Sequence, residues 1–120
     1  MSQFAASLPE VFEKMGRIEV KRMFGGHGLF LDGRMFALVS KDTLYLKSDA
    51  QTASHFDERQ LPPFTYLRAG KPTPTSYRQA PEEVFEDRDE AARWGARAFE
   101  VALRSGAPAS RKKRQAPRRA

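Results

Sequence analysis

The sequence of 120 residues contains no cysteine, which excludes disulfide bonds, thiolate zinc sites and cysteine nucleophiles. It also lacks any apolar run that approaches the roughly 18–20 residues needed to cross a bilayer. The N-terminal segment has no basic start followed by an apolar stretch, so it does not look like a secretory signal. These absences favour a cytoplasmic protein that does not enter the membrane.

Acidic residues are missing from the end of the chain, and this asymmetry explains the net charge of +6. Of the 21 lysines and arginines, six lie in the last ten residues, and the remaining fifteen match the fifteen acidic residues of the body. The basic character therefore belongs to a tail and not to the folded part. Its candidate nucleic-acid contacts are Arg111, Lys112, Lys113, Arg114, Arg118 and Arg119.

The composition changes near Gly106 and Pro108, beyond which no apolar side chain is larger than alanine. Such a segment cannot bury enough surface to offset the entropy lost on ordering. We therefore expect one domain over residues 1–104 and a disordered basic tail over residues 105–120.

Both ends of the predicted domain carry helical periodicity. Apolar residues three and four positions apart from Phe4 to Met15 predict a first helix, with Ser7 as its cap and Pro9 in its first turn. The last helix is expected to begin after Asp87, whose side chain suits an N-cap and which precedes Glu90 by three residues. Its buried stripe includes Trp94.

The middle of the chain reads as antiparallel strands. Ile18 to Met23 predicts a strand, and Asp32-Gly33 between two apolar runs is a strong signal for a two-residue hairpin. Further strands are expected over Thr43 to Lys47, Phe64 to Arg68 and Thr75 to Gln79. The predicted fold class is α+β, an antiparallel sheet of about five to six strands with N-terminal and C-terminal helices packed on it.

Pairing outward from Asp32-Gly33 opposes Leu29 to Phe36 and His27 to Leu38. One face of the sheet would then carry Leu29, Leu31, Phe36 and Leu38, and the other Phe30, Met35, Ala37 and Val39. Because both faces are apolar, this sheet needs cover on both sides. Self-association as a homodimer is one way to supply it.

The glycine-rich segment Gly25, Gly26, His27 and Gly28 allows two interpretations. It could be an anion- or ligand-binding loop in which His27 donates a hydrogen bond. No helix N-terminus follows it, however, so the usual dipole contribution to anion binding is missing. A tight connection with a bulge between two strands is the interpretation we favour.

Aromatic residues on the later strands are equally open to two interpretations. Phe64, Tyr66 and Tyr77 could form a stacking platform for single-stranded nucleic acid, with Arg68, Lys71 and Arg78 nearby. Aromatic residues on strands more often form core or cross-strand pairs.

No arrangement of residues points to catalysis. His27 and His55 have no metal-ligand partner at helical spacing, and the sequence contains neither a nucleophile elbow nor a phosphate-binding loop. The acidic run from Glu82 to Glu90 could bind a cation, but it also suits the start of a helix. We predict no catalytic residue, no metal and no cofactor.

The segment RMFGGHGLFLDGRMFALVSKDTLYLKSD, from Arg22 to Asp49, resembles the N-terminal domain of the TfoX/Sxy family. Further matching pieces are PFTY, SY, APEEVFED and the helix that contains Trp94. The resemblance implies a compact α+β domain found in regulators of natural competence. These regulators raise transcription of DNA-uptake genes by working with other regulators and not as enzymes.

Three hypotheses about function follow. The first is a small regulatory interaction module, TfoX-like, that contacts protein partners such as transcription machinery or regulators. The second is a protein that associates non-specifically with nucleic acid through its basic tail. The third, an enzyme or small-ligand binder that uses the loop at His27, ranks last.

Overall fold

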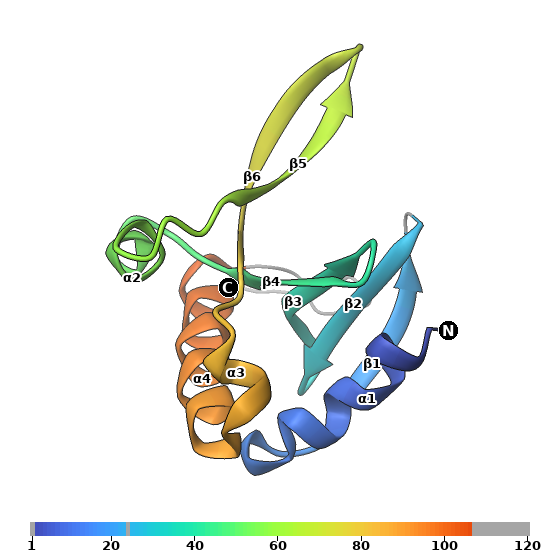
Figure 1. The fold of residues 1–120 in the computed structure, drawn as a ribbon, viewed down its shortest axis with the longest axis vertical. Coiled ribbons are helices and arrows are strands. Elements are labelled where there is room, and N and C mark those ends of the chain that lie inside the picture. The colour runs from blue at the N-terminus through green and yellow to red at the C-terminus, as the bar shows by residue number, and fades with distance from the viewer. Residues whose placement is uncertain (1, 24, 107–120) are drawn as a thin grey trace, which may run out of the picture.

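The structure, a computed structural model, describes residues 2–23 and 25–106. Within them the fold is α+β, as predicted: a six-stranded antiparallel sheet carries helices from both ends of the chain (Figure 1). The strands are β1 Ile18–Met23, β2 Gly26–Leu31, β3 Arg34–Ser40, β4 Thr43–Lys47, β5 Pro63–Arg68 and β6 Lys71–Gln79. The helical segments are α1 Gln3–Val11, the 3-10 turn η1 Glu13–Met15, α2 Ala53–Asp57, α3 Glu83–Glu86 and α4 Arg88–Arg104.

The sheet has the order β1-β2-β3-β4-β6-β5, and each neighbouring pair is antiparallel. β1 to β4 form a meander with tight turns at Asp32-Gly33, which the sequence predicted, and at Lys41-Asp42. All four turn residues have positive φ, the backbone conformation that type I′ turns require. β6 then enters beside β4, after the chain has passed through α2 and β5.

Side-chain caps fix where the terminal helices begin. The Asp87 carboxylate accepts hydrogen bonds from the backbone N–H groups of Asp89 at 2.8 Å and Glu90 at 3.4 Å, which confirms it as the N-cap of α4. The predicted start of α1 is wrong, because Ser2 caps it by accepting from the Ala5 N–H. Ser7 therefore lies inside the helix.

All the larger helices cover the same side of the sheet, and the main core lies between them. α4 packs over β3 and β4, and α1 packs against β1 (Figure 1). Buried side chains from helices and strands meet there, including Leu8, Phe12, Leu29, Leu31, Phe36, Ala37, Val39, Leu44, Leu46, Phe56, Val84 and Trp94. Among the described residues, no helix lies on the opposite side, which we call the outer face.

A β-bulge between β2 and β3 decides which residues reach that face. The pairing begins as predicted, but the register then shifts, so that Leu29 pairs with Ala37 and not with Phe36. Phe36 is the extra residue of β3, and both it and Ala37 are fully buried. The predicted pairing of Leu29 with Phe36 is therefore wrong.

The bulge reverses the orientation of every later residue in β3, because side chains alternate along a strand. Val39 lies in the core and pairs with Leu44, whereas Leu38 pairs with Tyr45 on the outer face. The sequence had predicted the opposite faces for Leu38 and Val39. His27 correspondingly lies opposite Val39 and not opposite Leu38.

β5 and β6 project from the body as a hairpin that we call the arm, residues 63–79 (Figure 1). β6 pairs with β4 only near its end, between Tyr77 and Gln79, and toward the tip it pairs with β5 alone. Pro72 and Pro74 lie in this one-sided part, as expected for residues that have no N–H to donate.

α2 occupies the region after β4 where a short helix was expected, but it is only five residues long. The turn before it is fixed by Asp49, whose carboxylate accepts hydrogen bonds from the N–H groups of Gln51 and Thr52. Among the described residues, no helix is both long and apolar enough to cross a membrane.

Candidate functional site

The glycine-rich segment is largely a strand and not a ligand-binding loop. Its turn includes Gly25, which has a φ of +76°, and β2 begins at Gly26, which pairs with Met23. The tight connection that the sequence favoured is therefore present, but the bulge lies further along, between Leu29 and Phe30. Each of the two glycines of β2 leaves room for a close neighbour. The carbonyl group of Val39 lies close to Gly26, and two methionine sulfur atoms lie close to Gly28.

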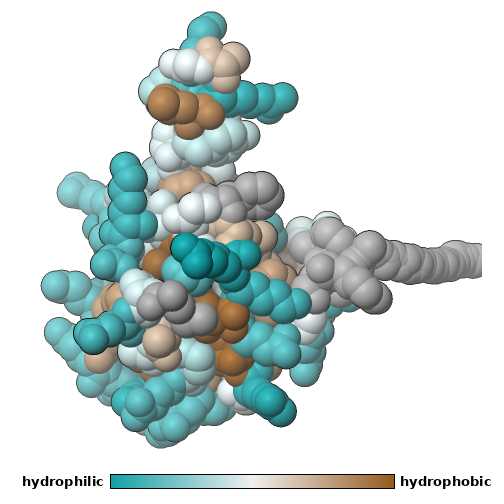
Figure 2. All heavy atoms as spheres, turned by 90° about the vertical axis from the view of Figure 1, so that its right-hand side faces the viewer, coloured by the Kyte–Doolittle hydropathy of each residue, from teal (hydrophilic) through white to brown (hydrophobic). Residues whose placement is uncertain are grey.

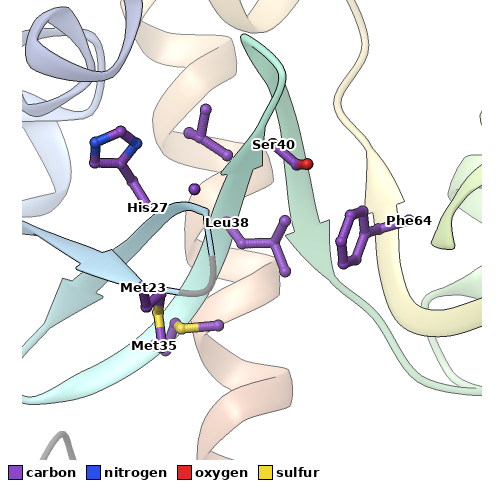
Figure 3. A pocket seen from close by; sticks show the side chains of 8 residues that line it. Met23, His27, Met35, Leu38, Ser40 and Phe64 are labelled. Carbon is purple, nitrogen blue, oxygen red and sulfur yellow. The ribbon is translucent and has the colours of Figure 1, made fainter. Parts of the chain in front are cut away.

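His27 points to the helix-covered side of the sheet, away from the methionines that line the outer face (Figure 3). Its Nε2 atom is buried without a hydrogen-bond partner in the part of the chain that the structure describes. No group of three or more histidine, cysteine, aspartate or glutamate side chains gathers as a metal site within residues 2–23 and 25–106. His27 therefore stands apart from any catalytic constellation in this region.

The outer face carries a second apolar cluster that is separate from the main core. Its residues come from strands far apart in the sequence: Met23, Phe30, Met35, Leu38, Tyr45 and Phe64. Phe30 is only 5% exposed, and the other five are half-buried. Figure 2 shows hydrophobic side chains gathered on the body below the arm and ringed by hydrophilic ones.

The absence of a side chain at Gly28 makes room for the two methionines of this cluster. A Cβ atom at Gly28 would stand 2.6 Å from the sulfur of Met23 and 2.7 Å from that of Met35. In Figure 3 the two thioethers lie side by side, with Leu38 and Phe64 further along the sheet. Together with Gly26, His27, Val39 and Ser40, these four residues line a hollow of about 120 Å³ that opens to solvent.

The predicted stacking platform is only partly assembled. Phe64 packs against Tyr45 with ring centroids 5.3 Å apart, and the ammonium of Lys47 sits 4.9 Å from the centroid of the Tyr77 ring. Tyr66 alone of the three predicted aromatics is strongly exposed, at 42%.

Arg78 does not join this group, because its guanidinium points to the helix-covered side. There it donates hydrogen bonds to the carbonyl of Leu61 and to the carboxylate of Asp57. Arg68 and Lys71, by contrast, lie opposite one another near the tip of the arm and are exposed.

Partial burial shifts the ionisation of two neighbours on the outer face. Burial lowers the pKa of the Lys47 ammonium, although the nearby carboxylate of Asp49 acts in the other direction. Burial also raises the pKa of the Tyr77 phenol to about 12. Both groups pack against each other in the low-polarity surroundings of the sheet.

Within the acidic run from Glu82 to Glu90, carboxylates stabilise the start of α4. This is the interpretation that the sequence favoured over a cation site. Asp87 caps α4, and Asp89 forms an ion pair with Lys14 of η1 at 2.7 Å. Glu83 and Glu90 pair with Arg59 and Arg93. Asp89 and Glu83 thus join different segments of the fold, whereas Glu90 pairs within α4.

The six basic residues proposed to contact nucleic acid lie outside the described residues. They are Arg111, Lys112, Lys113, Arg114, Arg118 and Arg119. The predicted boundary at residue 104 coincides with the last residue of α4. The predicted character of residues 107–120 stays a prediction.

Sequence reasoning missed the outer face as a site, because it placed Leu38 on the same face as Leu29 and Phe36 and gave no role to Tyr45. The alternation of apolar residues identified two apolar faces, but it contains no signal for an extra residue at Phe36. Only the paired strands reveal which residues share the face.

Comparison with known proteins identifies the domain. The TfoX N-terminal domain model matches residues 10–102, which include every strand and α4 almost to its end. The chain belongs to the TfoX N-terminal domain family. This assignment confirms the resemblance seen in the sequence and places the chain in a family of DNA-transformation, or competence, regulators.

Two curated relatives share this region. Protein Sxy of Escherichia coli (strain K12) is 26% identical over 95 residues, which is 79% of this chain and 46% of that protein. DNA transformation protein TfoX1 of Aliivibrio fischeri (strain ATCC 700601 / ES114) is 34% identical over 56 residues, 47% of this chain and 27% of that protein. The chain thus spans less than half the length of the curated relatives it matches.

Proposed function

We propose that the chain is a small regulatory interaction module that acts through protein contacts in the transcriptional control of DNA transformation. The match of the TfoX N-terminal domain over residues 10–102 carries this proposal. The partly exposed apolar cluster on the outer face supports it, because such surfaces mark sites of macromolecular contact. The proposal includes a role without catalysis and a location in the cytoplasm, where the controlled genes are transcribed.

Deletion of the gene in the native host tests this proposal. We expect lower transcription of DNA-uptake genes and a lower transformation frequency, both restored by the full chain expressed from a second locus. Unchanged transcription in the deletion strain under conditions that induce competence would contradict the proposal. A measured turnover reaction, abolished by a point change within residues 1–104, would contradict the non-catalytic part.

The second candidate function is non-specific association with nucleic acid through the basic tail. The six cations among the last ten residues favour it, because each cation that contacts a phosphate releases a counterion. The full chain should then bind DNA with an affinity that falls steeply with salt and is independent of sequence. Removal of residues 105–120 should abolish binding; a truncated chain that still binds would place the contacts on the domain.

A further inference from the structure

We propose that the outer face, together with the arm, is the docking surface for an acidic and apolar segment of a partner protein. This inference rests on the proposed function, because it names the surface and the chemistry through which a module of this kind makes its contacts. Three observations carry it: an apolar centre with a hollow, a rim of cations that form no ion pair among the described residues, and aromatic rings most of which are already covered.

The centre of the surface has the properties of an anchoring site. Its hollow of about 120 Å³ compares with the cavity of roughly 150 Å³ that accepts a benzene molecule in an engineered protein core. Met23 and Met35 line it with flexible, polarisable thioethers, which adapt to side chains of different shape. An apolar or aromatic side chain of a partner would fill it, as the central anchors of protein interfaces do.

Cations dominate the rim. The strand registers place Lys21, Lys47, Arg68 and Lys71 on the outer face and its continuation along the arm, and only one carboxylate, Glu19, joins them there within the described ranges. Lys21 and Lys47 lie over the rings of Phe30 and Tyr77. The arm, residues 63–79, contains no acidic residue.

The ion pairs of the described residues lie elsewhere. They use Lys14, Arg59, Arg78, Arg88, Arg93 and Arg104, which pair with carboxylates of the helices and of the loops beside them. The four rim cations form none of these pairs. A partner that brings carboxylates around an apolar anchor would therefore complement both the centre and the rim.

Single-stranded nucleic acid fits this surface less well. Base stacking needs exposed ring faces. Here Phe64 and Tyr45 cover each other and Lys47 covers Tyr77, whereas Tyr66 on the arm is 42% exposed. The centre also contains methionine and leucine, which offer neither stacking nor hydrogen bonds to bases.

A second copy of the chain across the same face is also disfavoured. A two-fold contact places the same patch on both sides of the interface. The four rim cations of one copy would then face those of the other copy. One glutamate per copy, Glu19, would have to balance this positive charge. Many of the carboxylates that could neutralise them, such as Glu83, Asp89 and Glu90, lie on the helix side and are already paired.

Selection of a random peptide library on the immobilised full chain tests the proposal directly. We expect enriched peptides that combine aspartate or glutamate with an apolar or aromatic residue. NMR shift mapping of the synthesised peptides should identify residues of the outer face. Enrichment of basic or uncharged peptides, no enrichment, or shifts confined to the helices would overturn the proposal.

Two variants separate the apolar centre from the cationic rim. Leu38→Glu changes the centre, and the pair Arg68→Glu with Lys71→Glu changes the exposed rim without touching the core. Each should weaken binding of a selected peptide at least about tenfold, and the rim variant should also reduce the salt dependence of binding.

Control variants change exposed residues on the helix side. Leu103→Glu introduces the same charge as Leu38→Glu at a residue of α4 that is 49% exposed. Arg22→Glu with Arg93→Glu matches the charge change of the rim variant, since both residues are exposed and Arg22 pairs with His27. These controls should bind the peptide as the wild type does; equal losses would overturn the proposal, because binding would then follow net charge or stability.

Two further measurements exclude the other occupants. Sedimentation that shows a dimer lost in Leu38→Glu would overturn the proposal in favour of a second copy. Single-stranded DNA that binds the full chain and is released by Leu38→Glu would overturn it in favour of nucleic acid. A complementation experiment separates this proposal from the proposed function. If the gene deletion lowers transcription of competence genes and the Leu38→Glu variant restores it fully, the outer face is not the docking surface, but the proposed function stands.

Discussion

The carbonyl group of Val39 occupies the place that a side chain on Gly26 would need. The two residues lie on neighbouring strands, and the overlap is with backbone, which cannot rotate away. Replacing Gly26 with alanine should therefore force β2 and β3 apart. We expect Gly26→Ala to destabilise the fold by about 3 kcal/mol, at the upper end of the usual cost of overpacking, measured by chemical denaturation.

Gly25→Ala is the matched control for that substitution. Gly25 has positive φ, but a Cβ atom there would meet nothing within 4 Å. Its cost should be limited to the backbone strain of a left-handed residue, roughly 1–2 kcal/mol. Equal losses at both positions would show that turn strain, and not the approach of Val39, limits this hairpin.

The bulge predicts opposite responses at two neighbouring positions of β3. Phe36 is fully buried and packs edge to face against Phe12, with ring centroids 5.6 Å apart. Phe36→Ala should cost about 3–5 kcal/mol of unfolding free energy. Leu38→Ala, on the half-buried outer face, should cost only about 1 kcal/mol. A larger loss at Leu38 than at Phe36 would contradict the observed register.

Asp49 gives the fold an acid-sensitive contact. Burial acts to raise the pKa of Asp49, but the hydrogen bond and charge of Arg104 and two backbone N–H groups outweigh it, so this pKa lies below its ordinary value. The group therefore stabilises the folded state fully above the unfolded pKa of about 3.9. This contribution is lost as pH falls through the lower pKa of the folded state.

Asp49→Ala tests this contact. The variant should lose about 1 kcal/mol at neutral pH, the usual value of a capping carboxylate. Its difference from the wild type should shrink below about pH 4. Denaturation curves at several pH values measure the difference, and a gap that stays constant down to the acid transition would show that the charge of Asp49 contributes nothing.

Tyr77 makes the fold sensitive at the alkaline end. Its pKa is raised to about 12 by burial, so the folded state resists ionisation of this phenol. Stability from this source is complete below the unfolded pKa of about 10 and declines as pH rises toward the folded value. In a phenolate absorbance titration, Tyr77→Phe should remove the component that titrates near pH 12. Loss of a component near pH 10 instead would contradict the burial of this ring.

The arm should open locally before the rest of the sheet. Between Lys71 and Thr75, β6 pairs with a strand on one side only, and Tyr66 and Leu67 are strongly exposed. Amide hydrogens near the tip should exchange much faster than those of β3, which has a strand on each side. Equal protection in the arm and in β3 would show that the hairpin is held by contacts beyond its own pairing.

Local sequence signals predicted most of this fold because they act over a few residues. Asp32-Gly33 fixed a turn, Asp87 fixed a helix start, and period-two apolar runs fixed the strands. Ser7 misled because a serine anywhere near a helix start resembles a cap, and only backbone geometry shows that Ser2 is used.

The outer face could not be assigned in the same way. Its composition depends on the extra residue Phe36, which no short-range pattern reveals, and on contacts between Tyr45 and Phe64 across 19 positions of sequence. Register is a property of paired strands, so a single strand cannot show it. The apolar character of both faces was nevertheless evident from the amino-acid sequence.

The prolines of the arm have a consequence for solubility. Pro72 pairs with Leu67 and Pro74 with Thr65. Pairs alternate along a hairpin with a two-residue turn, so these two are non-hydrogen-bonded pairs and both prolines face the open side of β6. There they offer carbonyl groups but no N–H donors. A strand from another molecule could not complete a ladder there, so the projecting hairpin resists the edge-to-edge stacking from which fibrils grow.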